Sequence, residues 1–277
     1  MEEVRIGEIR IGAGNPLALI AGPCVLEDEG IAFEVAREMK RICGGLGISY
    51  IFKASYEKDN RGSEKSYRGP GLEKGLRTLG RIKAEVGVPV LSDIHREEDV
   101  DAAKEVLDVL QIPAFLCQQT SLLLKVGGAG KPVNIKKGQF MAPEAMAGAA
   151  GKIRSTGNRQ VLLTERGTSF GYNKLVADLC SIPIMQATGC PVIFDATHVV
   201  RNYGIPSEDP RGGSPQFVPT LTRAGLAAGS NGLFLETHPD PSRAFCDASS
   251  MIPLGRMAEL LGQARALHDL TRAWGIA

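Results

Sequence analysis

Basic side chains follow several short apolar runs in this 277-residue sequence. Lys53 ends one such run and Lys58 comes in the loop after it, Lys136 and Lys137 end a second run, and Arg166 follows a third. A buried cation has a large desolvation cost unless an anion neutralises it. Arginine binds phosphate or carboxylate through paired hydrogen bonds, whereas lysine acts as a point charge. If these positions converge, they predict a site for a small polyanion.

A second polar segment follows Lys58 in the same loop, with the sequence Lys58-Asp59-Asn60-Arg61-Gly62-Ser63. Its Arg61 offers another anion contact at some distance along the chain from Lys53. Two separate anion sites would accommodate two phosphorylated substrates or one bisphosphate.

A thiol, an imidazole and two carboxyl groups form a candidate metal-binding set: Cys24, His198, Glu236 and Asp247. Together these donors suit a borderline divalent ion such as Zn²⁺, Fe²⁺ or Mn²⁺. The spacing has no local metal-binding signature, and a cysteine in Ala-Gly-Pro-Cys is often a small buried apolar residue. His238 competes as a ligand because it lies on the same strand face as Glu236. The residues alone leave this choice open.

These side chains need a scaffold that brings distant segments together. Short β-rich runs recur at 17–21, 50–54, 89–94, 106–112, 132–135, 160–164, 191–194 and 232–235, with helical apolar stripes between them, as in 31–39 and 254–267. Strands that alternate with helices pair in parallel through right-handed crossovers. We therefore predict an α/β fold, a (β/α)₈ TIM barrel formed by residues 1–277 as one domain. Residues 4–11 alternate around Gly7-Glu8 and predict a short N-terminal β-hairpin within a cap of residues 1–14.

In such a barrel the chemistry occurs where the strands end. Each predicted strand here is followed by reactive or polar side chains. They are Cys24; Lys53 and Ser55; Asp93 and His95; Gln111; Lys136 and Lys137; Glu165 and Arg166; Asp195 and His198; and Glu236 and His238. Strand ends become polar simply because the apolar run stops there. That explanation accounts for polar residues, but it does not account for so many ionisable groups at one rim. We expect a catalytic rim.

Composition excludes several other classes of protein. The net charge of +1 disfavours a nucleic-acid binder, and no apolar run approaches the length of a transmembrane span. The N-terminus lacks a signal-peptide core. The six cysteines are scattered without a CxxC pair, as expected of reduced thiols in a cytoplasmic protein.

A series of motifs occurs in order along the chain and carries a family resemblance. They include Ala21-Gly-Pro-Cys24, Phe52-Lys53-Ala-Ser55, Asn60-Arg61, Ser92-Asp93-Ile-His95, Gln111-Ile-Pro, Asn134-Ile-Lys136-Lys137-Gly-Gln139, Thr164-Glu-Arg166-Gly167, Phe170-Gly-Tyr172-Asn173, Asp195-Ala-Thr-His198 and Glu236-Thr-His-Pro-Asp240. The chain closely resembles the 3-deoxy-D-manno-octulosonate 8-phosphate synthases. That resemblance implies a homotetrameric TIM barrel. It also implies condensation of phosphoenolpyruvate with D-arabinose 5-phosphate and water for the inner sugar of lipopolysaccharide.

The resemblance also implies residue roles. Lys53, Ser55 and Lys58 would hold the phosphoenolpyruvate carboxylate, and Lys136, Arg166 and Gln111 its phosphate. Asn60, Arg61, Asp93 and His95 would face the pentose phosphate. Cys24 is typical of the metal-dependent branch, so Cys24, His198, Glu236 and Asp247 would bind one divalent metal ion (Zn, Fe, Mn or Co), and His238 would not. The residues implied to take part in catalysis are Cys24, His198, Lys53 and Asp93.

Several positions depart from the pattern of that family, including Asp59 and Gly62 in the segment 58–63 and three positions elsewhere. Gln118 stands where an arginine usually contacts the pentose phosphate, and Ser121 replaces an aspartate. Arg211 replaces a serine in the glycine- and proline-rich segment 199–216, which we expect to be a mobile loop over the site. Arg211 is a candidate to restore the missing charge. These departures leave two alternatives: a heptulosonate-type synthase with another acceptor, and a homologue that binds phosphoenolpyruvate without turnover.

Overall fold

The computed structural model describes residues 1–171, 173–206 and 209–275. Tyr172, part of one quoted motif, lies outside the described residues, as do positions 207–208 of the predicted loop at 199–216.

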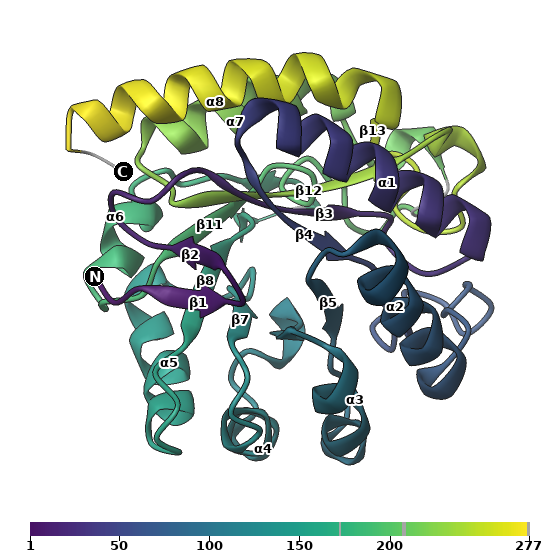
Figure 1. The fold of residues 1–277 in the computed structure, drawn as a ribbon, viewed down its shortest axis with the longest axis horizontal. Coiled ribbons are helices and arrows are strands. Elements are labelled where there is room, and N and C mark those ends of the chain that lie inside the picture. Colours follow the sequence, from purple (N-terminus) through teal and green to yellow (C-terminus); the bar gives the residue numbers. More distant parts are fainter. Residues whose placement is uncertain (172, 207–208, 276–277) are drawn as a thin grey trace.

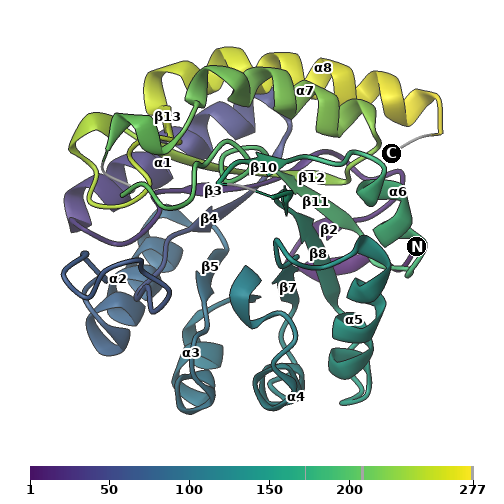
Figure 2. The same cartoon turned by 180° about the vertical axis from the view of Figure 1, so that it is seen from behind.

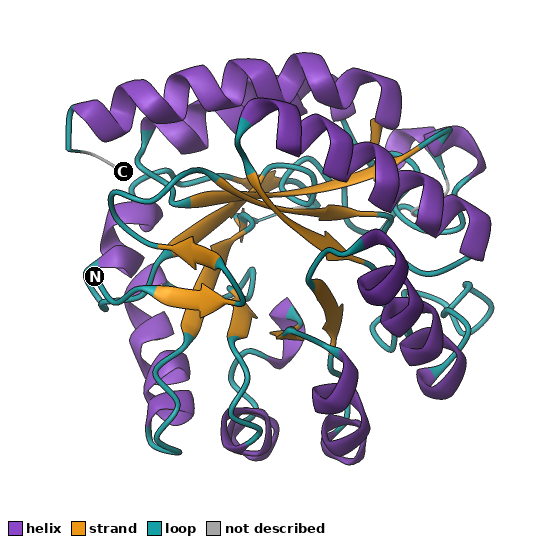
Figure 3. Ribbon diagram, in the orientation of Figure 1, coloured by secondary structure: helices purple, strands orange, loops and turns teal. Residues whose placement is uncertain are grey.

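Eight parallel strands form a closed barrel with helices outside it (Figures 1 and 3). Each strand pairs with the next, and the last pairs with both its predecessor and the first, which closes the ring. This confirms the predicted (β/α)₈ fold. The strands are β3 (Ala18–Gly22), β4 (Ser49–Lys53), β5 (Val90–Asp93), β6 (Val109–Ile112), β7 (Val133–Lys136), β8 (Val161–Glu165), β11 (Val192–Asp195) and β12 (Gly232–His238).

One predicted strand was too long at its start. The run 106–112 was expected to be extended throughout, but Val106 ends a helix and the strand begins at Val109. The backbone N–H of Leu107 donates to the carbonyl of Ala103 and completes the last helical turn. The Asp108 carboxylate then accepts from the Val90 N–H, which sets the point where pairing with β5 starts.

The outer helices bury the apolar stripes read from the sequence. In the first helix Ala32, Val35, Ala36 and Met39 are buried, and Asp28 caps its N-terminus by accepting from the Ile31 N–H. α7 and α8 lie side by side outside the barrel (Figure 2). The helices are α1 (Glu29–Leu46), α2 (Leu72–Val86), α3 (Val100–Val106), α4 (Thr120–Gly128), α5 (Met146–Arg154), α6 (Ser181–Gln186), α7 (Val218–Ala227) and α8 (Met257–Ala273).

Short elements complete the chain. β9 (Thr168–Ser169) pairs with β10 (Leu175–Val176), and β13 (Ile252–Pro253) extends the sheet beside β12. The 3₁₀ turns are η1 (Glu97–Asp99), η2 (Ala114–Leu116), η3 (Pro143–Ala145), η4 (Pro210–Gly212), η5 (Pro215–Phe217), η6 (Pro241–Arg243) and η7 (Leu254–Arg256). Within the described residues, no helix has both the length and the apolar character needed to cross a bilayer.

The predicted N-terminal hairpin is present as β1 (Val4–Ile6) and β2 (Ile9–Ile11). Its turn uses Gly7 at φ +57°, a left-handed conformation that glycine adopts without a steric penalty. Val4, Ile6 and Ile11 are buried in one cluster with inward-facing strand residues, among them Ile20, Ile51, Leu91, Ile193 and Phe234. The hairpin therefore closes one end of the barrel.

Toward the other end, the inward-facing positions become polar. The Gln111 amide donates to the Asp93 carboxylate at 2.6 Å, the Asn134 amide donates to Gln111 at 2.8 Å, and the Thr164 hydroxyl donates to Asn134 at 2.7 Å. The network crosses four adjacent strands and is buried. It fixes the polar side chains at the carboxyl ends of the strands, where barrels carry their sites.

Candidate active site

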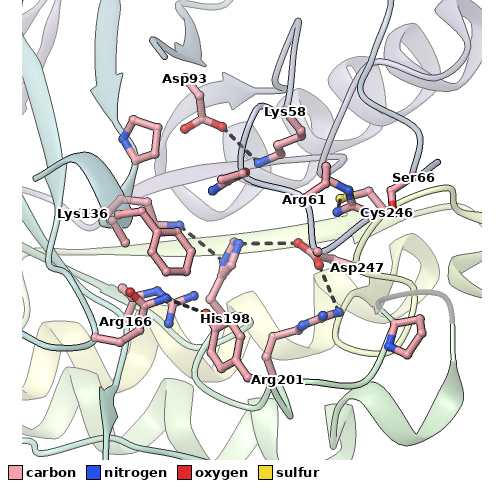
Figure 4. A pocket seen from close by; sticks show the side chains of 18 of the residues that line it. Lys58, Arg61, Ser66, Asp93, Lys136, Arg166, His198, Arg201, Cys246 and Asp247 are labelled. Atoms are coloured by element: carbon pink, nitrogen blue, oxygen red, sulfur yellow. Dashed lines mark hydrogen bonds and ion pairs between the residues drawn. The ribbon is translucent and has the colours of Figure 1, made fainter. Parts of the chain in front are cut away.

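A cavity of about 510 Å³ opens at the carboxyl ends of the strands (Figure 4). It brings together ten of the residues selected from the sequence, which come from seven strands and the loops beyond them. They are Lys53, Lys58, Asn60, Arg61, Asp93, Gln111, Lys136, Arg166, His198 and Asp247. Most of these are buried ionisable groups, so the cavity combines strong charge with little solvent.

The basic side chains are held by buried carboxylates. Lys136 lies 2.6 Å from Asp195 and Lys58 lies 3.0 Å from Asp93. Burial lowers the pKa of Lys136, and the nearby Asp195 only partly opposes this. Burial would lower the pKa of Lys58, but Asp93, together with Cys24 and Glu236, outweighs it, and the pKa rises well above its usual value. Lys58 is therefore a firmly fixed cation.

Arg166 differs from these residues because it forms no ion pair with a carboxylate among the described residues. Its side chain is buried, and the Nε and Nη1 atoms have no hydrogen-bond partner in that part of the chain. A buried guanidinium without acceptors is costly, so this arrangement favours an anionic ligand. The cavity offers that ligand Arg166 and Lys136 on the same wall (Figure 4).

Asp93 joins several of the predicted ligands. It accepts hydrogen bonds from the Ser55 hydroxyl, the Lys58 ammonium and the Gln111 amide. Burial would raise the pKa of Asp93, but Lys58 and Lys53 outweigh burial and hold it well below its usual value. Asp93 is thus a fixed anion that orders the side chains around it.

The four candidate metal ligands converge. Cys24 Sγ lies 3.2 Å from Asp247 Oδ2, and His198 Nε2 lies 3.6 Å from Asp247 Oδ2 and 3.7 Å from Glu236 Oε1. His198 Nδ1 lies 2.7 Å from Asp195, which favours a tautomer with the proton on Nδ1 and a free electron pair on Nε2. Glu236 Oε2 is buried without a hydrogen-bond partner among the described residues. An orphaned carboxylate oxygen on a residue grouped with an imidazole and a second carboxylate fits a divalent cation.

His238, the competing ligand, points elsewhere. Its Nε2 lies 3.3 Å from Glu27, and its Nδ1 accepts from the Asp240 N–H at 3.0 Å. Nε2 makes no hydrogen bond among the described residues, but the carboxylate beside it is Glu27 and not a member of the four-residue set.

The protonation states of the set depend on what neutralises it. Burial raises the pKa of Cys24 well above its usual value, and the nearby Cys246 and Asp247 raise it further. Burial alone would also raise the pKa of Asp247, but Arg201 and His198 bring it below the usual range. Without a cation the thiol is neutral and the carboxyl is ionised.

Not every predicted residue faces the cavity. Ser55 and His95 are buried beside Asp93 but are not part of the lining, and burial lowers the pKa of His95. Arg211 is not brought to the site in the described residues: its side chain is 81% exposed and lies 2.6 Å from Asp209. Gln118 is exposed beyond η2.

Sequence reasoning missed other residues that the cavity contains. Arg201 lies 3.0 Å from Asp247 Oδ1, and the Gln139 amide donates to the Tyr203 hydroxyl at 2.7 Å across the lining. Cys246 also lines the cavity next to Asp247. The sequence contained a signal for two of them. Arg201 comes three residues after the predicted ligand His198, and Cys246 comes directly before the predicted ligand Asp247.

Comparison with known proteins decides the relationship. The sequence pattern of the DAHP synthetase I family matches residues 2–272. The chain belongs to this family. Its relatives include proteins named 2-dehydro-3-deoxyphosphooctonate aldolase. The one from Syntrophotalea carbinolica is 50% identical over 98% of both chains, and the one from Citrifermentans bemidjiense is 52% identical over 97% of this chain and 98% of its own. The one from Acidithiobacillus ferrooxidans is 52% identical over 93% and 92%.

These relatives confirm the resemblance to the octulosonate phosphate synthases. The DAHP synthetase I family pattern spans nearly the whole barrel, so the motifs belong to one continuous likeness. The strand-end residues discussed above therefore lie in a barrel of this family.

Proposed function

We propose that this chain condenses phosphoenolpyruvate with D-arabinose 5-phosphate and water. The products would be 3-deoxy-D-manno-octulosonate 8-phosphate and phosphate, for the inner sugar of lipopolysaccharide. The observation that carries the proposal is one cavity lined by the unsatisfied Arg166 guanidinium, Lys136, His198 and Asp247. His198 and Asp247 connect this cavity to Cys24 and Glu236, which lie beside them outside the lining. An anion clamp beside these donors suits a reaction of an enol phosphate.

In the phosphoenolpyruvate half, Lys136 and Arg166 would bind the phosphate and Lys53 and Lys58 the carboxylate. Both parts of the substrate are anionic, and the four cations are already held in place by buried partners or by packing. Such preorganisation lowers the entropic cost of bringing two charged reactants together. Gln111 and Ser55 would act through Asp93, to which both donate.

In the sugar half, Asn60 and Arg61 line the outer part of the cavity and would contact the pentose phosphate. Asp93 would accept from a sugar hydroxyl, with His95 behind it. Arg211 remains a candidate for the same phosphate, but it would first have to leave Asp209.

Cys24, His198, Glu236 and Asp247 would hold a divalent metal ion (Zn, Fe, Mn or Co). When bound, the ion would supply positive charge that orients and polarises an oxygen atom of the reactants. Asp195 would keep His198 Nδ1 protonated, so that Nε2 stays available to the ion.

The bond changes follow from the chemistry of an enol phosphate. Carbon 3 of the enol would attack the aldehyde carbon of the sugar, water would add to carbon 2, and phosphate would leave by carbon–oxygen cleavage. Lys136 and Arg166 would stabilise the charge that develops on the leaving phosphate. The buried walls of the cavity would limit competing hydrolysis.

The proposal extends to assembly and location: a homotetramer in the cytoplasm, with no nucleic-acid or membrane partner. These follow from the family resemblance and the balanced charge.

Phosphate release from phosphoenolpyruvate with a panel of aldose phosphates tests the function. We expect release with arabinose 5-phosphate and much less with erythrose 4-phosphate. A preference for erythrose 4-phosphate would favour the heptulosonate alternative. Binding of phosphoenolpyruvate without release for any sugar would favour the homologue without turnover.

A further inference from the structure

An ion pair between Arg201 and Asp247 joins two loops at the rim of the barrel. Arg201 Nη1 lies 3.0 Å from Asp247 Oδ1, and the two side chains are only 10% and 12% exposed. In Figure 4 the dashed lines from Asp247 run in different directions to Arg201 and to His198. Arg201 therefore approaches the candidate metal set through Asp247 alone.

The two carboxylate oxygens of Asp247 have different neighbours. Oδ1 lies against Arg201, whereas Oδ2 accepts from Cys24 Sγ at 3.2 Å and lies 3.6 Å from His198 Nε2. A carboxylate can bind a cation through one oxygen or through both. With Arg201 at Oδ1, only Oδ2 is directed toward the other candidate ligands.

The backbone at Asp247 does not fix this orientation by itself. Asp247 lies in the loop between η6 and β13, outside any helix or strand. Its φ is +52°, and it is the one non-glycine residue with a positive φ in the described ranges. A residue in such a conformation persists only where its surroundings hold it. The side chain of Asp247 therefore needs partners that fix its direction.

The loop that carries Arg201 is itself anchored beside Asp247. The Ser214 N–H donates to the Val200 carbonyl at 3.0 Å, and Arg201 pairs with Gly213 next to this hydrogen bond. Arg201 Nη1 also donates to the Ser249 hydroxyl at 3.4 Å. A Cβ atom at Gly213 would overlap the carbonyl oxygen of Ser249, so the two loops approach each other closely. This packing places the Arg201 guanidinium at Oδ1.

We propose that Arg201 is a positioning residue of the metal centre, which holds Asp247 Oδ1 and so presents Oδ2 alone to the ion. Groups that hold a metal ligand from outside commonly set its orientation and the affinity of the site. This inference rests on the metal site of the proposed function, not on the identity of the sugar.

The charge and the contact of Arg201 have opposite effects on a bound cation. The positive charge repels a nearby metal ion, so loss of the charge alone would strengthen metal binding. Loss of the positioning contact would weaken it. The sign of the change in affinity therefore separates the proposal from a purely electrostatic role.

The test is a competition titration of the metal-free full-length protein with Zn²⁺ and a fluorescent chelator, without substrates. Arg201→Met should bind Zn²⁺ about 10- to 100-fold more weakly than the wild type. Because only Nη1 contacts Oδ1, the point charge of lysine can replace it, and Arg201→Lys should lose less than about threefold. Unchanged or stronger binding in Arg201→Met would overturn the proposal.

Asn202→Ala is the matched control in the same loop. The Asn202 amide donates to the Arg211 carbonyl at 2.8 Å and so holds the loop without contacting Asp247. This variant should keep the wild-type affinity for Zn²⁺. Equal losses in Asn202→Ala and Arg201→Met would overturn the proposal, because any disturbance of the loop would then have the same effect.

A spectroscopic measurement tests the geometry directly. In Arg201→Met, Oδ1 is free to bind beside Oδ2, and Co²⁺ absorbs visible light more weakly as its number of ligands rises. The absorbance per bound Co²⁺ should therefore fall in Arg201→Met and stay at the wild-type value in Asn202→Ala. A wild-type spectrum in Arg201→Met would overturn the proposal.

Gly213→Ala provides a test that keeps the charge of Arg201. The added methyl group would force the loop away from Ser249 and carry Arg201 with it, so Zn²⁺ affinity should fall by about tenfold or more. Unchanged affinity would overturn the proposal even if Arg201→Met fails to fold. If the affinities and spectra agree with the proposal but no sugar supports phosphate release, the proposed function fails while this inference stands.

Discussion

Lys53 Nζ lies 2.6 Å from Glu236 Oε1, and both side chains are buried. This ion pair joins the proposed phosphoenolpyruvate clamp to the candidate metal set. Burial would lower the pKa of Lys53, but Glu236, together with Cys24 and Asp93, outweighs it, and the pKa lies above its usual value. Glu236 therefore depends on Lys53 for neutralisation, and a bound cation would share that task.

The first prediction concerns this pair. Lys53→Met leaves Glu236 as a buried charge without its partner, which costs about 3–5 kcal/mol of folding stability. A bound cation would replace part of the lost charge. We expect the fall in melting temperature to be clearly smaller with Zn²⁺ than with EDTA, as measured by thermal denaturation.

Lys137→Met is the matched control. Lys137 lies 3.6 Å from Glu165, and both are fully buried but away from the metal set. The fall in melting temperature caused by Lys137→Met should be the same with Zn²⁺ and with EDTA. Equal losses for Lys53→Met under the two conditions would show that Glu236 does not contact an ion.

The fold could be predicted well because its signals are local. Each strand combines β-rich apolar residues with a polar end, and each helix buries a stripe at three- and four-residue spacing, as Val35 and Met39 do. The end of α3 was wrong because Val106, a β-branched residue, reads as strand while its helical turn is completed by the Leu107 N–H. The conformational preferences of single residues do not predict that hydrogen bond.

The site was less accessible to sequence reasoning. The type of residue at each strand end predicted the cations and carboxylates, but not which of them pair. Arg201 was missed because its partner, Asp247, is distant in sequence and meets it only through the folded loops. Arg211 was selected for its charge, but the neighbouring Asp209 binds it.

The second prediction concerns metal removal. Chelation should abolish turnover, and Zn²⁺, Mn²⁺, Co²⁺ or Fe²⁺ should restore it, because the donor set is otherwise an uncompensated buried cluster. Cys24→Ala should lose metal affinity and keep the fold, since only a small side chain is removed. Cys180→Ala should keep both. Elemental analysis with circular dichroism measures this, and full activity in a metal-free preparation would contradict it.

The third prediction concerns the partner of His198. Asp195→Asn weakens the hold on Nδ1, so the ring no longer presents Nε2 reliably to an ion. Loss of such a partner lowers metal affinity by about 10- to 100-fold. Competition titration with a fluorescent chelator measures the affinity. Asp209→Asn, at an exposed loop, is the control, and equal affinities in the two variants would contradict the prediction.

The fourth prediction concerns pH. The pKa of Asp93 lies well below its usual value in the folded protein, because Lys58 and Lys53 outweigh burial. The unfolded chain, with an aspartate pKa of about 4, therefore binds a proton first as pH falls. The stabilisation is fully present above about pH 4 and is lost as pH falls toward the folded-state pKa.

Urea unfolding in EDTA between pH 7 and pH 3 tests this. The gap in unfolding free energy between wild type and Asp93→Asn should be largest at pH 7 and should narrow below about pH 4, where the wild type loses the Asp93 contribution. Glu144→Gln, at an exposed position, should follow the wild type throughout. A constant gap across the range would contradict the prediction.

The last prediction concerns the acceptor phosphate. Arg61 lines the cavity, whereas the Arg211 side chain is 81% exposed and paired with Asp209. A hydrogen bond to a charged group contributes about 1.5–3 kcal/mol, or roughly 10- to 150-fold in binding. Arg61→Ala should therefore raise the KM for arabinose 5-phosphate by about that factor and leave the KM for phosphoenolpyruvate nearly unchanged.

Arg211→Ser should change either constant by less than about threefold, because Arg211 must exchange one anion for another. Steady-state kinetics with each substrate varied in turn decides between them. A larger effect on arabinose 5-phosphate from Arg211→Ser than from Arg61→Ala would mean that the loop at 199–216 brings Arg211 to the sugar phosphate when substrate binds.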